Sequence, residues 1–571
     1  MFSTEFRYKL NNLRRILKKA TVQLIRILFI LASVATIVLM AYEYGYAISE
    51  AGKRYVTEGF NIIIRIFFFG SIATIFLDPK EIWQEKGYWI EIIVLALLLF
   101  VILTQTPAHF PTDNWLQKTD HILTHILLLF ISIIHLSKVV VTGLQRHIRP
   151  EMTFVYSFLA IILTGAFLLM LPKAHHGSLS FIDALFTATS GVCITGLSSI
   201  QCNAVLSGFG QAVLLLLIQI GGMGITTLGV GIILLTGKKI GIRERTLIKE
   251  SLNQPSFQGI LRLLKVMLMV TFGIEGAGAV LSFPIFVQDY PVGKAVWLSV
   301  FHSVSAFNNA GFDLIGGSSL AVYRNHVPML LLTSALTICG GLGFVVMLNI
   351  AQKRRFRRLS LHTKVVLTMT VLLLTVGTLL LHATQHGLTW VQSFFYSAVT
   401  RTSGFSIYDL GDFSNASLLC MILLMFVGAA PGSTGGGIKV TTLFVCIWSA
   451  IAYTRNQHPT VFRRRFSQEV RDKALMIFLM GLSVVLVSTF LLCMLEPDAS
   501  FIQVLMETTS AFATVGLSCG LTGGLSGLSK LVLILTMYIG RLGPLTVATL
   551  WIVQGRRNSE ILRPEETISV G

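Results

Sequence analysis

The chain has 571 residues, of which 53% are hydrophobic and 13% are charged, and its mean hydropathy is +0.74. Soluble globular proteins carry about 25% charged residues, so this composition excludes them and predicts an all-α polytopic membrane protein. The net charge of +18 does not indicate a nucleic-acid partner, because the Lys and Arg residues lie in short loops between apolar segments, as the positive-inside rule describes.

Four apolar segments occupy residues 1–150 and predict an N-terminal bundle of four spans whose role stays open. The segments run from about Val22 to Tyr46, Phe60 to Leu77, Trp89 to Thr106 and His121 to Val141. The first is too long for the core of a signal peptide and is expected to remain as a span. If the N-terminus is inside the cell, four spans return the chain to the inner side, and both termini are predicted to be cytoplasmic.

Polar residues within this bundle are interpreted as packing contacts. Arg65 lies inside the second segment, but a voltage sensor needs several arginines at every third position of one helix. The fourth segment carries His121, His125 and His135 instead, and these are expected to contact neighbouring helices. The seven cysteines form no CxxC pair and have no histidines at metal-binding spacing, so the sequence predicts neither a disulfide framework nor a metal-binding motif.

Residues 151–556 repeat one unit four times: a long apolar span, a short amphipathic segment, a glycine-bearing stretch and another span. At about 1.5 Å per residue, the short segments cover about half of a hydrocarbon core near 30 Å thick, which predicts pore helices rather than spans. The units are predicted at 151–256, 257–361, 362–465 and 466–556, with a cytoplasmic tail at 557–571. The pore helices are predicted at Phe181 to Ser190, Ala295 to Phe307, Trp390 to Val399 and Phe501 to Phe512. The spans after them are predicted at Ala212 to Thr236, Val327 to Ala351, from Ala416 onward, and Leu528 to Ile552.

One glycine follows each predicted pore helix: Gly196, Gly311, Gly404 and Gly516. A ring of backbone carbonyls can replace the hydration water of a cation, and glycine tolerates the positive φ that such a loop requires. Four such loops in register predict a pore with a backbone selectivity filter, in which a cation binds at the four glycines. The predicted filter residues are Ile194, Thr195, Gly196, Asn309, Ala310, Gly311, Thr402, Ser403, Gly404, Thr514, Val515 and Gly516.

The run GAAPGSTGGG from Gly428 to Gly437 breaks the last span of the third unit, because proline removes a backbone donor and each glycine costs about 1 kcal/mol relative to alanine. We interpret it as a movable gate beneath the filter; a rigid kink is the other interpretation. Arg541 lies deep in the last span, where a cation needs partners, and the freed loop carbonyls are candidate acceptors. The predicted gate residues are Gly428, Pro431, Gly432, Ser433, Thr434, Gly435, Gly436, Gly437 and Arg541.

Several polar residues lie near the predicted filter. Asn308, Asn309, Arg401 and Glu507 could tune its electrostatics, and each also fits a packing contact whose hydrogen bonds are satisfied. Cys193 is interpreted as a side chain that packs behind the filter.

The stretches FTATSGVCITGL, SVFHSVSAFNNAGF, AVTRTSGF and SAFATVGLS, together with GKKIGIRERTLIKESLNQ, RRLSLHTK, GAAPGSTGGGIK and YIGRLGPLT, resemble the Trk/Ktr/HKT family of potassium transport proteins, and most of all its KtrB-type membrane subunits. The resemblance covers about Glu151 to Gln554. It implies potassium as the transported ion, since members with serine at the first filter position tend to carry sodium and this chain has Gly196. Sodium as a coupling or activating ion stays open.

The resemblance also implies a homodimer in the cell membrane, an intramembrane gate loop with an arginine that holds the constriction, and a ring of cytosolic nucleotide-binding regulatory subunits. No cofactor is expected in this chain itself. The sequence carries no phosphate-binding GK[ST] loop, no HExxH motif and no spaced carboxylate pair within the spans, so an enzyme is not predicted. The alternatives are an ion-coupled secondary carrier of a small solute and a sodium-selective member of the same family.

Overall fold

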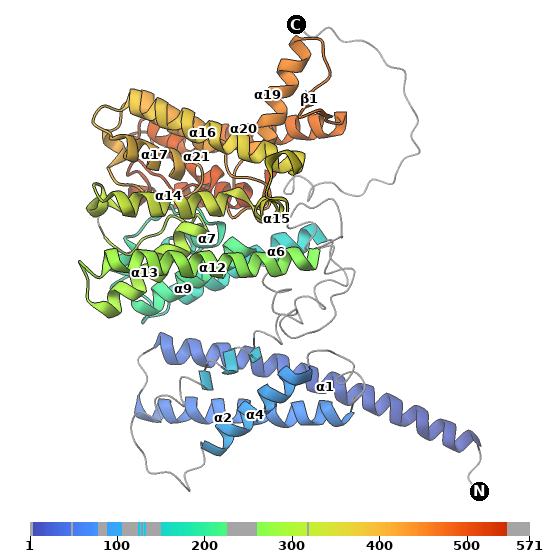
Figure 1. The fold of residues 1–571 in the computed structure, drawn as a ribbon. Coiled ribbons are helices and arrows are strands. Elements are labelled where there is room, and N and C mark those ends of the chain that lie inside the picture. Colours follow the sequence, from blue (N-terminus) through green and yellow to red (C-terminus); the bar gives the residue numbers. More distant parts are fainter. Residues whose placement is uncertain are drawn as a thin grey trace.

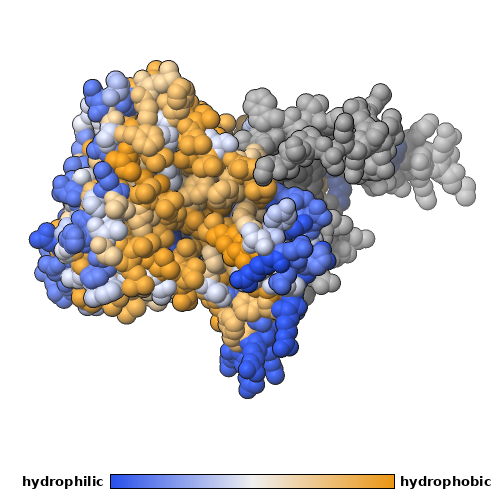
Figure 2. All heavy atoms as spheres, turned by 90° about the horizontal axis from the view of Figure 1, so that it is seen from above, coloured by the Kyte–Doolittle hydropathy of each residue, from blue (hydrophilic) through white to orange (hydrophobic). Residues whose placement is uncertain are grey.

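The computed structural model describes residues 4–46, 49–77, 88–104, 124–125, 127–129, 131–132, 150–224, 260–316 and 319–544. Apart from one two-stranded hairpin, β1 (Thr460–Val461) with β2 (Arg464–Arg465), the regular structure of these residues is helical. Five described helices are long and apolar enough to cross a membrane, or six spans if one bent helix pair counts as a single span. Figure 2 shows the corresponding surface, a broad apolar band with hydrophilic residues gathered at its ends.

The N-terminal part forms a separate group of helices beside the remainder of the protein (Figure 1): α1 (Thr4–Gly45), α2 (Glu50–Leu77) and α4 (Tyr88–Thr104). Their buried side chains, among them Phe67 and Leu98, form a hydrophobic cluster of their own. Arg65 on α2 is exposed. His125 makes the predicted kind of helix contact, with Nε2 2.9 Å from Oε2 of Glu43 on α1. His121 and His135 lie outside the described residues.

The helices of residues 150–544 follow one order four times (Figure 1): a long helix, a shorter helix, a loop and a further helix. The first unit has α6 (Pro150–Leu169), α7 (Phe181–Cys193), α8 (Cys202–Val205) and α9 (Gly208–Met223), and the second has α12 (Ile260–Phe286), α13 (Val292–Phe307), α14 (Val327–Leu342) and α15 (Phe344–Lys353). The third has α16 (Leu361–Thr384), α17 (Trp390–Val399), α18 (Asn415–Phe426) and α19 (Val440–Thr454), and the fourth has α20 (Gln468–Leu495), α21 (Phe501–Ala513) and α22 (Gly527–Leu542).

Hydroxyl side chains fix where three of the short helices begin. Ser180 caps α7, with its Oγ accepting from Asp183 N at 3.1 Å. Thr389 and Ser500 form capping boxes at the starts of α17 and α21. Such caps satisfy backbone donors that the first turn leaves free, and they confirm the predicted starts of these three helices. The fourth, α13, starts at Val292 after Pro291, three residues before the predicted Ala295.

Three inner helices end at the same kind of glycine break. Gly224, Gly343 and Gly543 have φ of 78°, 86° and 88° and ψ of 139°, 138° and 136°. The prediction of one continuous span from Val327 to Ala351 is therefore wrong: α14 and α15 meet at Gly343 at a bend of 92°. Hydropathy does not detect this break, because apolar residues lie on both sides of a glycine whose φ is positive. The last parts of the predicted spans Ala212 to Thr236 and Leu528 to Ile552 lie outside the described residues.

Candidate functional site

The four glycines of the predicted filter meet in a closed ring. A Cβ built on Gly196 would lie 3.3 Å from the Cα of Gly311, and one on Gly311 would lie 3.3 Å from the Cα of Gly404. A Cβ on Gly404 would lie 2.9 Å from the Cα of Gly516, and one on Gly516 would lie 2.9 Å from the Cα of Gly196. The loops of the first, second, third and fourth units are thus neighbours in that order around one centre, and the fourth closes on the first.

Backbone oxygens fill the space beside each glycine. A side chain on each glycine would overlap a carbonyl oxygen of the neighbouring loop. The pairs are Gly196 with Ala310 O, Gly311 with Ser403 O, Gly404 with Val515 O and Gly516 with Thr195 O. The four glycines have φ between 69° and 98°, a region that L side chains rarely adopt. Both the contact and the backbone conformation therefore require glycine at these positions.

The backbone around the ring differs between the units. Ile194, Asn309 and Thr514 follow the short helices of their units with φ of 57°, 60° and 51°, whereas Thr402 of the third unit has no positive φ. Ser190 and Ser510, six residues before the glycine, accept from Gly196 N at 3.0 Å and Gly516 N at 2.9 Å. The third unit has Ala398 at this position, and there Gly404 N donates to Val399 O. The ring is therefore only pseudo-symmetric.

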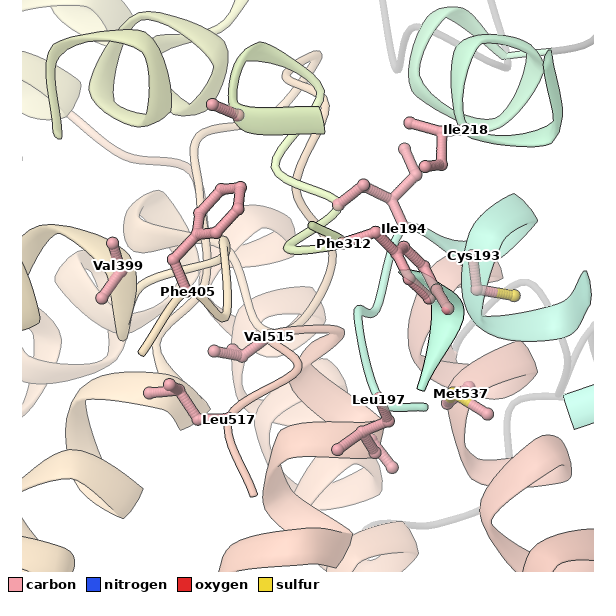
Figure 3. Close-up of a cluster of buried hydrophobic side chains, with 14 of the residues drawn as sticks. Cys193, Ile194, Leu197, Ile218, Phe312, Val399, Phe405, Val515, Leu517 and Met537 are labelled. Atoms are coloured by element: carbon pink, nitrogen blue, oxygen red, sulfur yellow. The ribbon is translucent and has the colours of Figure 1, made fainter. Parts of the chain in front are cut away.

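Large apolar side chains anchor the loops. The residue after each glycine is Leu197, Phe312, Phe405 or Leu517, and all four are buried in one hydrophobic cluster that includes residues of all four units. Figure 3 shows them around the loops, with Cys193 nearby. Cys193 is buried and free, as a packing side chain would be.

The predicted gate loop, residues 428–437 between α18 and α19, lies against three of the four filter strands. Asn309 Nδ2 lies 3.1 Å from Thr434 Oγ1, Gly436 N donates to Thr514 Oγ1 at 3.1 Å, and the Cα of Gly435 faces the Thr402 side chain. The Asn309 amide is better satisfied in the swapped orientation, with its oxygen 3.1 Å from the hydroxyls of both Thr402 and Thr434.

The loop also bonds to the break between α14 and α15. Ala430 N donates to Gly341 O at 3.1 Å, and Phe344 N, at the start of α15, donates to Gly432 O at 3.1 Å. Ser433 donates back to Ala430 O, and Gly428 N donates to Ile438 O at 2.8 Å, which closes the base of the loop. Pro431 supplies no donor, and its carbonyl lies against Gly343.

Two half-buried cations hold the loop carbonyls. Arg541 Nη1 donates to Thr434 O, and its Nη2 donates to Gly221 O of the first unit. Lys439 Nζ donates to Gly435 O at 2.6 Å and to Gly436 O at 3.3 Å. Charge-assisted hydrogen bonds of this kind are stronger than neutral ones, so the conformation of the loop depends on both side chains.

The other polar residues near the filter differ in their surroundings. Glu507 is buried on α21 and accepts from Ser518 and Thr522, the latter at 2.8 Å, and so ties down the loop after Gly516. Asn308 donates to Glu275 at 2.8 Å. Arg401 is buried, and its Nε has no hydrogen-bond partner among the described residues.

Sequence reasoning missed Lys439, the serines Ser190 and Ser510, and the paired glycines at the helix breaks. A signal for the glycines was present in GGMG, GGLG and GRLG, which occur at 221–224, 340–343 and 540–543. In this alignment Arg541 takes the place of Gly222 and Gly341, so the last unit alone of these three carries a cation at the break.

Known proteins resemble this chain over most of its length. Residues 123–560 match the TrkH family model, described as cation transport protein. The Ktr system potassium uptake protein B of Bacillus subtilis (strain 168) is 40% identical over 414 residues, which are 70% of this chain and 92% of the relative. The potassium/sodium uptake protein NtpJ of Enterococcus hirae is 37% identical over 444 residues, which are 75% of this chain and 98% of NtpJ.

The fold has a solved counterpart as well. The crystal structure of the potassium transporter TrkH from Vibrio parahaemolyticus superimposes with a TM-score of 0.59 at 20% identity, covering 81% of this chain and 97% of that chain. The family match begins at residue 123 and leaves most of the N-terminal helices outside it. This protein is accordingly a multi-pass membrane transporter and not an enzyme, and the chain belongs to the TrkH family of cation transport proteins.

Proposed function

We propose that this protein takes up potassium across the cell membrane through a pore whose selectivity filter is the ring of four loops. The observation that carries the proposal is the closed order of Gly196, Gly311, Gly404 and Gly516, each beside a carbonyl oxygen of the next loop. The curated relatives at 40% and 37% identity are named for uptake of potassium and of potassium or sodium. Their names support the choice of ion.

The proposed filter uses main-chain oxygen in place of fixed charge. A cation that enters must lose part of its hydration water, and carbonyl oxygens from four strands replace that water. The helices α7, α13, α17 and α21 end next to the filter, so their C-terminal dipoles favour a cation in the space beneath it. In this proposal the predicted filter residues supply oxygens, and the bulky residues behind them keep the ring at one width.

The loop at 428–437 is the proposed gate. Its contacts with Asn309 and Thr514, which lie two residues before filter glycines, support this role, as do the bonds of Arg541 and Lys439 to its carbonyls. Because every one of these contacts is a hydrogen bond and none is covalent, the loop can leave the pathway when the contacts are lost. The rigid-kink interpretation predicts that removing these contacts changes stability and leaves the ion flux unchanged.

The assembly is proposed by family analogy. We expect a homodimer with both termini cytoplasmic. We also expect regulation by separate nucleotide-binding subunits at the inner membrane surface, since the described residues form no soluble domain that could bind a nucleotide. Nucleotide-dependent flux through the purified chain alone would contradict this expectation.

Isotope flux tests the proposed function. Proteoliposomes that contain the purified chain should take up ⁸⁶Rb⁺, and external K⁺ should inhibit this uptake more strongly than external Na⁺. Gly196→Ser should lower this preference, because a Cβ on Gly196 would lie 2.5 Å from Ala310 O. Stronger competition by Na⁺ than by K⁺ in the wild type would favour a sodium-selective family member. Saturable uptake of an organic solute without cation flux would favour a carrier instead of a pore.

A further inference from the structure

A membrane-embedded carboxyl group lies behind the second filter strand. Glu275 is the middle residue of the candidate span Leu264–Phe286 in α12, and it is only 5% exposed. An ionisable group at this depth is costly for a membrane protein and indicates a functional site by default. The proposed ion pathway does not use it, since its contacts are with side chains outside the ring of glycines.

Two amide groups from other helices converge on this carboxyl group. Asn308 Nδ2 donates to Glu275 Oε1 at 2.8 Å, and Gln219 Nε2 donates to Glu275 Oε2 at 3.2 Å. Gln219 lies on α9 of the first unit, and Asn308 directly follows α13 of the second. The cluster therefore joins the first two units at the inner end of a pore helix.

The hydrogen bonds fit an ionised carboxylate. Both carboxyl oxygens face N–H donors, whereas a protonated carboxyl group would need an acceptor for its own proton. Among the residues that the structure describes, no ion pair involves Glu275. A buried carboxylate without a cationic partner is unfavourable, so its charge calls for a counter-ion other than the side chains that the structure describes.

The cluster contains further oxygens for such an ion. Asn308 Oδ1 is buried and has no hydrogen-bond partner, and Gln219 Oε1 lies 3.2 Å from Asn308 Nδ2. In the structure Asn308 Nδ2 donates to Gln219 Oε1, Glu275 Oε1 and Val304 O. Half a turn of the amide would exchange these bonds for an Oδ1 that faces the carboxylate, so that oxygens from all three side chains converge. Three oxygens in contact repel one another unless a cation lies between them.

The Asn308 side chain packs closely against the backbone of Gly222. A Cβ on Gly222 would overlap the Asn308 side chain, with Cγ only 2.5 Å away, so the second glycine of GGMG is needed for the Asn308 amide to fit. One carboxylate with two neutral oxygens matches a single positive charge, whereas Ca²⁺ takes six to eight oxygens and Mg²⁺ demands a near-ideal octahedron.

We propose that Gln219, Glu275 and Asn308 bind a monovalent alkali cation at a site outside the ion pathway. Asn308 caps α13 and precedes Asn309, which has φ of 60° in the second filter strand. An ion held there fixes the Asn308 backbone and with it the start of this strand. The site thus orders the filter from behind and does not conduct.

Equilibrium binding of ²²Na⁺ and ⁸⁶Rb⁺ to the purified full-length chain tests the site. Glu275→Gln keeps the shape and removes the charge, and it should bind one ion fewer per chain than the wild type. Thr271→Val is the matched control, because Thr271 lies one turn earlier on α12, is buried, and has a hydroxyl without a partner; it should bind as many ions as the wild type. Gly311→Ser should bind fewer ions in the filter and should still bind the ion at Glu275. Failure of the proposed filter and failure of the proposed Glu275 site are therefore distinguishable.

Thermal unfolding gives a readout without ion counting. At constant ionic strength, Na⁺ or Rb⁺ in place of choline should raise the melting temperature of wild type and Thr271→Val more than that of Glu275→Gln, since an ion stabilises the state that binds it. If Glu275→Gln does not fold, Gln219→Leu should weaken the same ion about tenfold or more by removing one ligand. Equal binding by wild type and Glu275→Gln, or a stability that responds to pH but to neither alkali ion, would overturn the proposal, the latter by making a proton the counter-ion.

Discussion

The Arg541 guanidinium links the loop at 428–437 to the first unit, because it donates to Thr434 O in the loop and to Gly221 O at the end of α9. One side chain of the last unit thereby connects the third unit with the first. Since both acceptors are carbonyls beside a helix break, this fork replaces bonds that a continuous helix would make within its own backbone.

Arg541→Gln should increase ion flux through the purified chain. A hydrogen bond from a charged donor contributes about 1.5–3 kcal/mol, so losing the fork shifts a closed-to-open equilibrium about tenfold or more towards the open state. Flux of ⁸⁶Rb⁺ into proteoliposomes measures this shift. Lys530→Gln is the matched control, because Lys530 lies on the same helix and pairs with Asp183 at 2.8 Å, away from the loop; it should leave the flux close to wild type. Folded Arg541→Gln protein with unchanged or lower flux would contradict a gating role.

Gly311→Ala should abolish selective uptake, whereas Gly520→Ala should retain it. Both glycines have positive φ, 70° and 82°, so alanine strains the backbone in each. They differ in their neighbours, because a Cβ on Gly311 would overlap Ser403 O and one on Gly520 would meet nothing within 4 Å. The comparison separates overlap in the ring from backbone strain alone. Competition of K⁺ and Na⁺ against ⁸⁶Rb⁺ uptake measures the result, and equal selectivity in the two variants would mean that the overlap does not matter.

Ser510→Ala should lower the K⁺ preference without preventing uptake. Its Oγ accepts from Gly516 N at 2.9 Å, and the variant removes the partner of this part-buried N–H at a cost of about 1 kcal/mol. Ser483→Ala serves as control, because the Ser483 hydroxyl is exposed and bonds only within its own helix. The ratio of K⁺ to Na⁺ competition is the readout. A ratio as high as in the wild type would show that the serine supports folding but not the filter.

The local parts of this structure could be predicted from the sequence, and the parts that depend on distant residues could not. The glycines of the four stretches and of the run at 428–437 predict irregular backbone from residue type alone. Ser500 with Gln503 predicts the start of α21. The break at Gly343 was missed because apolar residues continue on both sides of it. Lys439 gave no signal, since only the folded loop brings its amine to Gly435 O.

The cluster behind the filter illustrates the same limit. Gln219, Glu275 and Asn308 are separated by 56, 33 and 89 residues pairwise, and each alone resembles an ordinary polar residue in a span. Packing between the first and second units brings these residues of α9, α12 and the end of α13 together, and the sequence of a single unit does not contain that information. The sequence predicts Asn308 only as a polar residue near the filter, and its partners Gln219 and Glu275 depend on the fold.

Acidification should remove a contact that joins α20 to α22 at the loop end of the fourth unit. Glu496, the residue after α20, accepts from Ser526 N at 2.8 Å and from Ser529 Oγ at 2.7 Å. The backbone hydrogen bond from Ser526, with that of the Ser529 hydroxyl, lowers the pKa of this carboxyl group. A lowered folded-state pKa means that the carboxylate stabilises the fold at neutral pH and that this stabilisation disappears as the pH falls through the folded-state pKa.

Glu496→Gln should therefore melt below wild type at neutral pH, and the difference should shrink on acidification because the wild-type carboxylate becomes neutral as well. Melting temperatures of the purified chain over a pH series measure the difference. Asp498→Asn changes the charge of the same loop without removing the bonds to Ser526 and Ser529, and its difference from wild type should not follow the same course. A gap between wild type and Glu496→Gln that stays constant with pH would mean that the shape of the side chain, and not its charge, holds the two helices together.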